Sequence, residues 1–386
     1  MHDARPPLLS TLLARFGESR RSRRDFLAQA SALGAAVGGS ALLGCRGEET
    51  RERREEAGER RDSAQRSAPR QGVHPRNADS KLDTAIHRPG EHGGTSVTGA
   101  TSAADTVPFR RFDPALPPLS KERTLRLHWT AREHPVRISA DTVVAAWTFE
   151  GDIPGPVVHC RVGDTIEFTL TNEGMVPHSM DFHAAQVDPK VAFRSVIKGQ
   201  SVTYTFKPRW AGAFMYHCGT APVLMHIGSG MYGAIIVSPR EPLPPAKEFV
   251  LVQSEFYLAD AENGMRAFDY QKMLSTIPEF VAFNGRPNQY VDAPIHVKVG
   301  DRVRFHVVNA GPTAHCSFHV VGEQFDTVYL GAPPGNAMRG VQTFDVSPGG
   351  GMVFELVADI PGEFPFVNHG FGHGQKGAMG FLVVEK

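Results

Sequence analysis

The sequence predicts an all-β protein with two tandem Greek-key β-sandwich domains after a disordered N-terminal tether. Three observations support this prediction. Beyond residue 118, stretches of five to eight residues alternate apolar and polar side chains, which is the pattern of half-buried strands. Glycine and proline, at 39 and 29 of the 386 residues, separate these stretches as turn residues do. The same motifs occur twice, about 130 residues apart, which indicates two related domains.

Three pairs of segments carry the repeat. VVHCRVGDTIEFTLTNEG (157–174) matches IHVKVGDRVRFHVVNAG (295–311), AGAFMYHCG (211–219) matches PGEFPFVNHG (361–370), and MYGAIIVSP (231–239) matches AMGFLVVEK (378–386). The first domain is therefore expected over 119–240 and the second over 246–386, joined by the proline-rich EPLPPAKE. A short helical or loop insertion is expected within 261–279.

Residues 1–45 are interpreted as an export signal of the twin-arginine (Tat) type. SRRDFL (22–27) contains the paired arginines, and the small apolar stretch from Ala30 to Leu43 is too short to span a bilayer. LLGC (42–45) resembles a bacterial lipoprotein cleavage site, so Cys45 is a candidate lipid anchor. The alternatives are cleavage at small residues without lipidation, or a retained anchor. Each predicts a periplasmic or cell-surface protein.

Residues 46–118 are expected to form a disordered linker. They are rich first in arginine and glutamate and then in serine, glycine, proline and histidine, without hydrophobic periodicity. Such a segment cannot bury enough apolar surface to order itself. His74, His87 and His92 within it are expected to be solvated rather than metal ligands.

Charge and cysteine content exclude several classes of protein. Lysine plus arginine and aspartate plus glutamate both number 41, so no net charge attracts nucleic acid or anionic lipid. Four irregularly spaced cysteines do not describe a disulfide framework. Cys160 and Cys316 are expected to be buried thiols, because a bridge between them would cross the two domains.

One loop carries most of a copper ligand set. In AFMYHCGTAPVLMHIGSGMYG (213–233), seven residues separate Cys218 from His226, and four separate His226 from Met231. A thiolate, two imidazoles and a long axial thioether form a blue-type copper site for electron transfer. His178, in VPHSMDFHAAQ, is the candidate for the second imidazole. Met225 is the alternative thioether, but it adjoins His226 and would point elsewhere.

Strand geometry predicts a second cluster behind the first. Successive side chains of a strand point to opposite faces, so His217 points outward if Cys218 points into its domain. Asp181 and His183 are two residues apart and share a face. We therefore expect His217, His183 and Asp181 to gather outside the sandwich.

The second cluster is one imidazole short of a catalytic metal site with three protein ligands. The second domain has a histidine at 369 to offer. If these expectations hold, neighbouring residues bind two different metals, and an electron crosses between them through a few covalent bonds.

In order and spacing, these motifs resemble the copper-containing nitrite reductases, a two-domain cupredoxin family of the multicopper oxidase superfamily. HSMDFHAAQ, YHCG with MHIGSGMYGAIIV, SFHVVGEQFDTVY and FVNHGFGH carry the resemblance, which covers about 120–386. It implies two coppers per chain: type 1 copper at His178, Cys218, His226 and Met231, and type 2 copper at His183, His217 and His369. It also implies a homotrimer in which His369 comes from a neighbouring subunit.

The resemblance further implies a reaction and its residues. Nitrite, one electron and two protons give nitric oxide and water, as in denitrification. Asp181 and His319 would position nitrite and deliver protons, with Val321 as an apolar wall over the copper. A histidine suits the second role because its unperturbed pKa is about 6.5. The electron donor would be a small cupredoxin or a c-type cytochrome. His315 and His373 receive no role.

The sequence has two alternative interpretations. A laccase-like two-domain multicopper oxidase reduces oxygen at a three-copper cluster that uses His-x-His pairs. The sequence has no such pair, and residue 219 is glycine rather than histidine. A non-catalytic copper protein for electron transfer would leave His183, His217 and His369 without a purpose.

Overall fold

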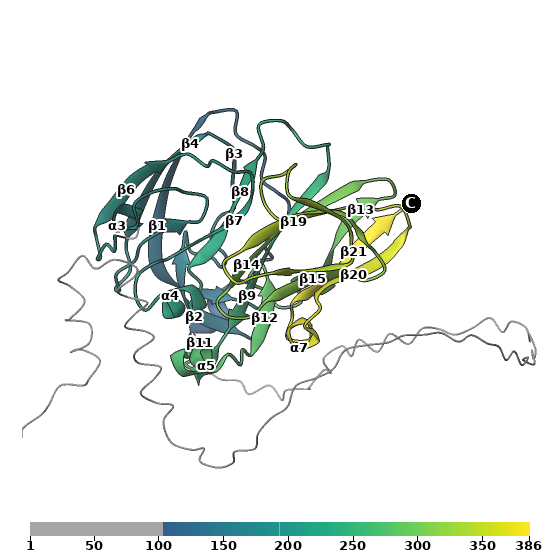
Figure 1. Cartoon of the computed structure of the whole chain (residues 1–386). Helices are drawn as coiled ribbons and strands as arrows, with labels where there is room; N and C mark the ends of the chain where they lie inside the picture. Colours follow the sequence, from purple (N-terminus) through teal and green to yellow (C-terminus); the bar gives the residue numbers. More distant parts are fainter. Residues whose placement is uncertain (1–102, 193) are drawn as a thin grey trace, which may run out of the picture. The chain divides into compact units, whose positions relative to one another are not determined.

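The computed structural model of the chain describes residues 103–192 and 194–386 (Figure 1). The export signal expected over 1–45, with Cys45, lies outside the described residues, as does the linker up to residue 102. Strands dominate the described part and its helices are short, which confirms the all-β prediction. In this part of the chain, no helix has the length and apolarity needed to cross a membrane.

The first sandwich consists of two sheets. One has the strand order β10-β11-β2-β1-β4-β6 and the other β3-β8-β7-β5. Among these, β1 spans Thr124–Arg137, β2 Val143–Phe149, β3 Val158–Arg161, β4 Thr165–Asn172, β5 Asp181–Phe182, β6 Ser201–Phe206, β7 Gly212–His217 and β8 Tyr232–Ser238. Helix α3 covers Pro189–Ala192, and α4 covers Val223–Gly228 between β7 and β8.

The second sandwich repeats this plan. Its sheets have the orders β12-β9-β14-β19-β16-β17 and β13-β21-β20-β15-β18. The bounds are β9 Lys247–Phe256, β12 Phe280–Phe283, β13 Ala293–Lys298, β14 Arg302–Gly311, β15 Cys316–Val320, β16 Phe325–Tyr329, β17 Ala337–Val341, β18 Thr343–Val346, β19 Gly351–Val357, β20 Gly362–Asn368 and β21 Met379–Glu385. Helix α6 covers Gln289–Asp292 and α7 Phe371–Gly374.

The segment expected as an insertion belongs to the sheet of the first sandwich. Strands β10 (Leu258–Glu262) and β11 (Met265–Phe268) form a hairpin, and β11 pairs with β2 through Arg266 and Val144. Helix α5 (Tyr270–Ser275) follows, with the carboxylate of Asp269 accepting hydrogen bonds at its start. It lies so close to α4 that a side chain at Gly228 would collide with Met273. Helix α5 thus supports the helix that carries His226.

Residues 103–118, which the sequence places in the linker, pack against the sandwiches. The 3-10 helix η1 covers Ala103–Thr106. The Leu116 amide donates to the Glu248 carbonyl at 3.0 Å, and the Val250 amide donates to the Pro114 carbonyl at 2.7 Å. This segment therefore runs along the first half of β9, beside residues that β12 does not pair with. Backbone pairing of this kind needs no hydrophobic periodicity, so the pattern that identifies strands does not reveal it.

The hydrophobic core has three parts. One lies inside the first sandwich, one inside the second, and a third contains residues of both, among them Val144, Met215, Val252 and Val308. The two sandwiches also use the same internal brace. Asn172 donates its amide protons to two carbonyl oxygens at 2.8 Å, and Asn309 does the same at the matching turn of the second sandwich.

Candidate metal centres

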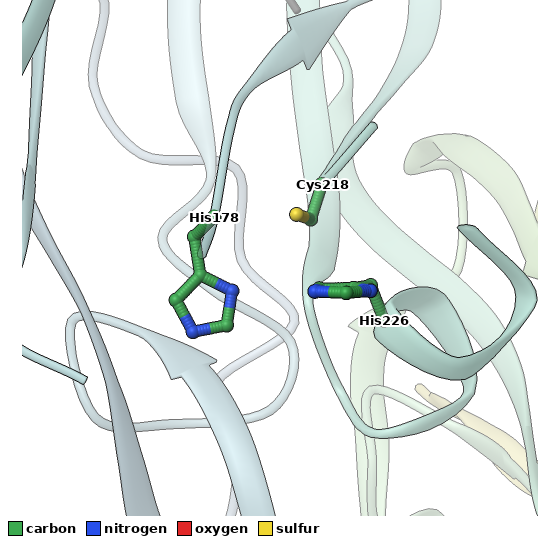
Figure 2. A group of neighbouring side chains, drawn as sticks. All are labelled: His178, Cys218 and His226. Atoms are coloured by element: carbon green, nitrogen blue, oxygen red, sulfur yellow. The ribbon is translucent and has the colours of Figure 1, made fainter. Parts of the chain in front are cut away.

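Three buried side chains of the first sandwich converge on one point (Figure 2). His178 lies just before β5, Cys218 directly follows β7, and His226 lies in α4. Their ligand atoms all lie within 4.8 Å of one another. Figure 2 shows the two imidazole rings on either side of the position that the sulfur faces.

The chemistry of this group fits a bound cation. Both ring nitrogens of His178 are buried and have no hydrogen-bond partner, an arrangement that costs free energy unless something coordinates them. Burial, with a smaller contribution from His226, lowers the pKa of His178 to about 4, so the ring is neutral and offers a lone pair. Trp147 packs edge-on against both rings, with centroid distances of 5.8 Å and 4.8 Å. Two imidazoles and a sulfur are a donor set suited to copper.

In the metal-free protein, burial and hydrogen bonding have opposite effects on the thiol of Cys218. Burial raises the pKa of its thiol, while hydrogen bonds from Ser179 and Thr220 act in the opposite direction. The Ser179 amide donates to the sulfur at 3.4 Å. A cation beside the sulfur would favour the thiolate, because the thiolate is the form that binds metals.

The two candidate thioethers lie in different cores. Met231 is fully buried and belongs to the core inside the first sandwich, which also contains Cys218. The Cys218 amide donates to the Met231 carbonyl at 3.1 Å, which fixes the two backbones side by side. Met225 packs against the core shared by the two sandwiches. The packing therefore favours Met231 as the sulfur ligand.

A second group lies on the other side of β7. Strand β5 pairs with β7 so that Asp181 is opposite His217. The Nε2 atoms of His217 and His183 lie 3.0 Å apart, and Oδ2 of Asp181 lies 3.6 Å and 3.8 Å from them. The His217 side chain is 12 % exposed, Asp181 20 % and His183 32 %, so this group has access to solvent.

Hydrogen bonds fix the tautomers of both histidines in the second group. Nδ1 of His217 lies 2.9 Å from the Cys218 carbonyl, and Nδ1 of His183 lies 2.9 Å from the Gly349 carbonyl. Because a carbonyl only accepts, each Nδ1 carries the proton and each Nε2 of a neutral ring carries a lone pair. Burial lowers the pKa of His217 to about 4, which keeps that ring neutral. Two lone pairs and a carboxylate oxygen thus converge without a donor, an arrangement that a metal cation would satisfy.

His319 and His369 lie together in the second sandwich. Their ring centroids are 5.4 Å apart. His319 is on β15, with Nδ1 2.6 Å from the Gln342 carbonyl, and the exposed His369 directly follows β20. Val321, which directly follows β15, is 39 % exposed. Within this single chain, His369 does not join His183 and His217 in a group of ligand atoms.

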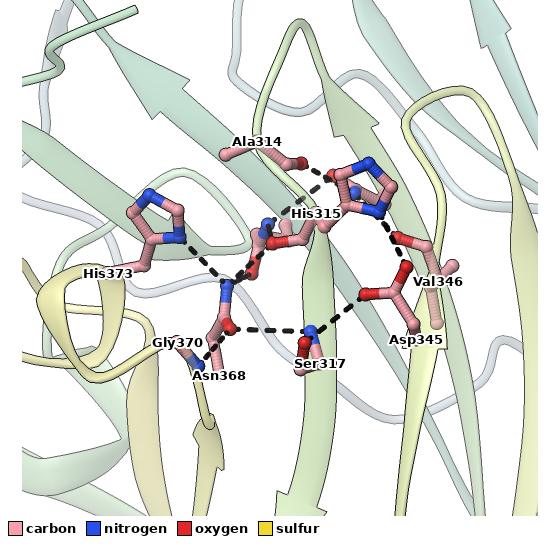
Figure 3. Close-up of polar contacts among 10 residues, drawn as sticks. Ala314, His315, Ser317, Asp345, Val346, Asn368, Gly370 and His373 are labelled. Carbon is pink, nitrogen blue, oxygen red and sulfur yellow. Dashed lines mark hydrogen bonds and ion pairs between the residues drawn. The ribbon is translucent and has the colours of Figure 1, made fainter. Parts of the chain in front are cut away.

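Asn368 occupies the position in the second sandwich that Cys218 has in the first. Its amide nitrogen lies 2.8 Å from both Gln253 Oε1 and the His315 carbonyl, and its oxygen accepts from the Gly370 amide at 2.9 Å (Figure 3). The nitrogen and the oxygen of the side-chain amide therefore both have hydrogen-bond partners within the protein. Across 103–192 and 194–386, only the two groups above bring three such ligand atoms together.

The remaining two histidines near this amide make local contacts. Nδ1 of His315 lies 2.5 Å from Asp345 in an exposed ion pair. Nδ1 of His373 lies 3.5 Å from the Asn368 amide nitrogen. Neither belongs to a group of potential ligands among the described residues.

Several residues of the two centres carry no clear sequence signal. The Gly349 carbonyl that orients His183 is 166 positions away and is a backbone atom. The sequence alone does not distinguish Trp147 from any other aromatic residue of the core. Ser179 is the exception, because it directly follows His178 in the sequence and would lie near any metal that this histidine binds.

Comparison with known proteins supports a copper protein. Residues 130–242 and 262–386 match two family models, both described as multicopper oxidase. The copper-containing nitrite reductase of Neisseria meningitidis serogroup A is 42 % identical over 249 residues, which are 62 % of this chain and 64 % of that protein. The chain thus spans somewhat less than two thirds of that relative.

Two further comparisons cover more of the other protein. The copper-containing nitrite reductase of Cereibacter sphaeroides is 32 % identical over 281 residues, or 66 % of this chain and 74 % of that protein. A solved structure of copper nitrite reductase from Nitrosomonas europaea is 35 % identical with a TM-score of 0.64, covering 68 % of this chain and 94 % of that one. The chain belongs to the copper-containing nitrite reductase family, within the multicopper oxidases.

Proposed function

We propose that the protein is a copper-dependent nitrite reductase that converts nitrite, one electron and two protons into nitric oxide and water. One observation carries the proposal: adjacent residues, His217 and Cys218, belong to two different groups of metal ligands. A site that receives an electron and a site that uses it are then joined by a few covalent bonds. Neither an isolated electron carrier nor a single-metal hydrolase needs this arrangement.

The ligands divide into two sets. Type 1 copper is assigned to His178, Cys218, His226 and Met231, and type 2 copper to His183, His217 and the partner subunit's His369. When bound, the first copper stores an electron and the second acts as a Lewis acid toward nitrite. The second group supports a third ligand from outside the chain, because it has two imidazoles and is open to solvent.

Asp181 and His319 are assigned to substrate positioning and proton delivery. Burial raises the pKa of Asp181, with the charge of His183 opposing it, so its carboxyl group keeps a proton at higher pH than an exposed aspartate does. Such a group can donate a hydrogen bond and then a proton to a nitrite oxygen. Nδ1 of His319 donates to the Gln342 carbonyl, which leaves Nε2 to contact the substrate. Val321 is the apolar wall.

The proposal extends to the oligomeric state, the electron donor and the location of the enzyme. We propose a homotrimer, in which each type 2 site lies between two chains, and a small cupredoxin or c-type cytochrome as the electron donor. The twin-arginine pattern supports export to the periplasm or the cell surface, with Cys45 as a possible point of lipid attachment.

Anaerobic nitric oxide production tests the proposal. Copper-loaded protein with an artificial one-electron donor should form nitric oxide from nitrite. Asp181→Asn should keep both coppers and lose about 100-fold in rate, as expected for loss of a general acid. His369→Ala should lose type 2 copper. The exposed residues Asp188 and His296 provide control variants, Asp188→Asn and His296→Ala, which should match wild type. Copper-loaded wild type that forms no nitric oxide would remove the proposal.

The copper content and the spectra of the same preparation distinguish the proposal from the two alternative functions. A laccase-like oxidase would contain four coppers per chain and consume oxygen, whereas the proposal requires two. The described residues offer two groups of ligands rather than a three-metal cluster. A non-catalytic carrier would show the type 1 absorption band without a type 2 signal in electron paramagnetic resonance.

A further inference from the structure

Three hydroxyl groups form a chain that ends at the sulfur of Cys218. Ser195 Oγ lies 2.8 Å from Thr220 Oγ1, which lies 3.1 Å from Ser179 Oγ. Ser179 Oγ lies 3.9 Å from Cys218 Sγ, within hydrogen-bond range for sulfur. Ser195 is exposed, Thr220 is 8 % exposed and Ser179 is fully buried, so the chain runs from the protein surface to the sulfur.

The donors and acceptors along this chain have one consistent direction. Ser179 Oγ accepts from the Gly219 amide at 3.1 Å, and it accepts again from Thr220 Oγ1. Both of its lone pairs are then used, and the sulfur is the remaining partner for its own proton. Thr220 has given its proton to Ser179, so Ser195 must donate to Thr220. Every hydroxyl proton therefore points toward Cys218.

We propose that Ser179 is a positioning residue whose hydroxyl donates to the Cys218 sulfur and raises the reduction potential of the type 1 copper, with Thr220 and Ser195 strengthening that bond. The inference rests on the type 1 copper of the proposed function, but on none of its nitrite chemistry. The centre becomes more negative by one charge when one electron reduces it. The positive end of an O–H dipole at the sulfur then stabilises the reduced state more than the oxidised one.

The backbone and the hydroxyl chain act on the sulfur together. The Ser179 amide already donates to Cys218 Sγ at 3.4 Å, so the hydroxyl is a second donor from the same residue. Each hydroxyl behind it polarises the next, because hydrogen bonds in a chain strengthen one another. The effect on the potential should therefore decrease with distance from the sulfur.

The test is the midpoint potential of the copper-loaded full chain, followed through the sulfur-to-copper absorption band. Ser179→Ala should shift the equilibrium toward the oxidised form by about tenfold, which is about 59 mV for one electron. Thr220→Val should lower the potential by less, and Ser195→Ala by less again. Ser201→Ala is the matched control: Ser201 lines the same surface hollow as Ser195, but its hydroxyl bonds to Thr171 at 2.9 Å. It should leave the potential unchanged.

The outcomes separate tuning from a purely structural role. A structural role predicts weaker copper binding with an unchanged potential, whereas tuning predicts a graded fall in potential with the copper retained. The inference is overturned if Ser179→Ala and Thr220→Val both keep the wild-type potential or raise it. If Ser179→Ala fails to hold copper, Thr220→Val decides alone. The measurement of the midpoint potential needs no nitrite, so it is independent of the proposed reaction. If the potentials are graded but the protein forms no nitric oxide, this inference holds and the proposed function is wrong.

Discussion

The side chains of His217 and Cys218 belong to different groups of potential ligands because successive side chains at the end of β7 point to opposite sides. Cys218 is fully buried in the first sandwich, whereas His217 faces the solvent-accessible group on the other side. The link between the two groups is the backbone itself, so no movement of a side chain is needed to connect them. The two groups should nevertheless respond separately to substitution.

The first prediction concerns this separation. Cys218→Ser should abolish the sulfur-to-copper absorption band and leave the type 2 signal in electron paramagnetic resonance. His183→Ala should do the reverse, because its ring lies in the other group. Both variants should stop electron flow to nitrite. Loss of both signals in either variant, with folding intact by circular dichroism, would contradict two independent sites.

At this scale the sequence predicts much of the site. Strand alternation places Cys218 and His217 on opposite sides, and spacing brings Asp181 next to His183. It does not predict the tautomer of His183, because this depends on the carbonyl of Gly349 in the other sandwich. Nor does it predict the hydrogen-bond chain behind the sulfur, because Ser195 reaches Thr220 only after the chain has folded.

Strand β7 is supported by a close contact with β8. Gly233 lies opposite Tyr216, and a Cβ at that glycine would lie 2.2 Å from the Tyr216 hydroxyl. The second sandwich has the same arrangement, where a Cβ at Gly380 would lie 2.3 Å from the ring of Phe366. In both sandwiches a glycine makes room for a buried aromatic ring at the centre of the sheet.

The second prediction tests this support. Gly233→Ala should push Tyr216 aside, cost about 2 kcal/mol or more in the free energy of unfolding, and reduce copper occupancy. Tyr216 adjoins His217, so its displacement also disturbs both groups of ligands. Gly372→Ala is the control, since a Cβ there meets nothing within 4 Å. Urea unfolding of the two metal-free variants measures the difference, and equal stability would refute the account of β7.

The third prediction concerns pH and strands β9 and β14. Glu248 on β9 lies 2.8 Å from His306 and 3.0 Å from Arg304 on β14. Burial alone would raise the pKa of Glu248, but His306 and Arg304 together lower it to about 2. Its folded pKa thus lies below the ordinary 4.5, so the stability it contributes is present above pH 4.5 and lost as the pH falls toward 2.

Glu248→Gln should therefore destabilise the metal-free protein by about 2 kcal/mol at pH 7. The gap between variant and wild type should shrink between about pH 4.5 and 2. Urea unfolding at pH 7 and at pH 3 measures it. A gap of the same size at both pH values would mean that the carboxylate charge is not the source.

Elements differ in how far the sequence predicts them. Alternation identifies the long strands of both sandwiches. It does not show that β10 and β11, which follow the interdomain linker, add to the sheet of β2, because Arg266 and Val144 are distant in sequence. The same holds for residues 103–118, whose order comes from backbone pairing along β9 rather than from a hydrophobic pattern.

At the scale of the whole molecule, the residues that the proposed function assigns to the type 2 copper and to catalysis are divided between the two sandwiches. Asp181, His183 and His217 lie in the first, and His319 and His369 lie in the second. The shared core holds the sandwiches of one chain together, yet His369 does not reach the other two histidines within that chain. Under the proposed function, association of several chains completes the site.

The fourth prediction is subunit complementation. His183→Ala and His369→Ala should each be inactive when expressed alone. Co-expressed in equal amounts, they should recover about a quarter of the sites, because each site needs the intact His183 of one chain and the intact His369 of the next. His183→Ala co-expressed with His183→Ala,His369→Ala is the control and should stay inactive. No recovery in mixed trimers, with trimers verified by native mass spectrometry, would place the site within one chain.

The central claim is that two metals lie back to back across positions 217 and 218. The most direct test is an anomalous-scattering map of crystals of the copper-loaded protein, recorded at the copper edge. The account predicts two peaks per chain, one touching the sulfur of Cys218 and one touching Nε2 of His217. A single peak per chain, or one ion bound by both of these side chains, would contradict it.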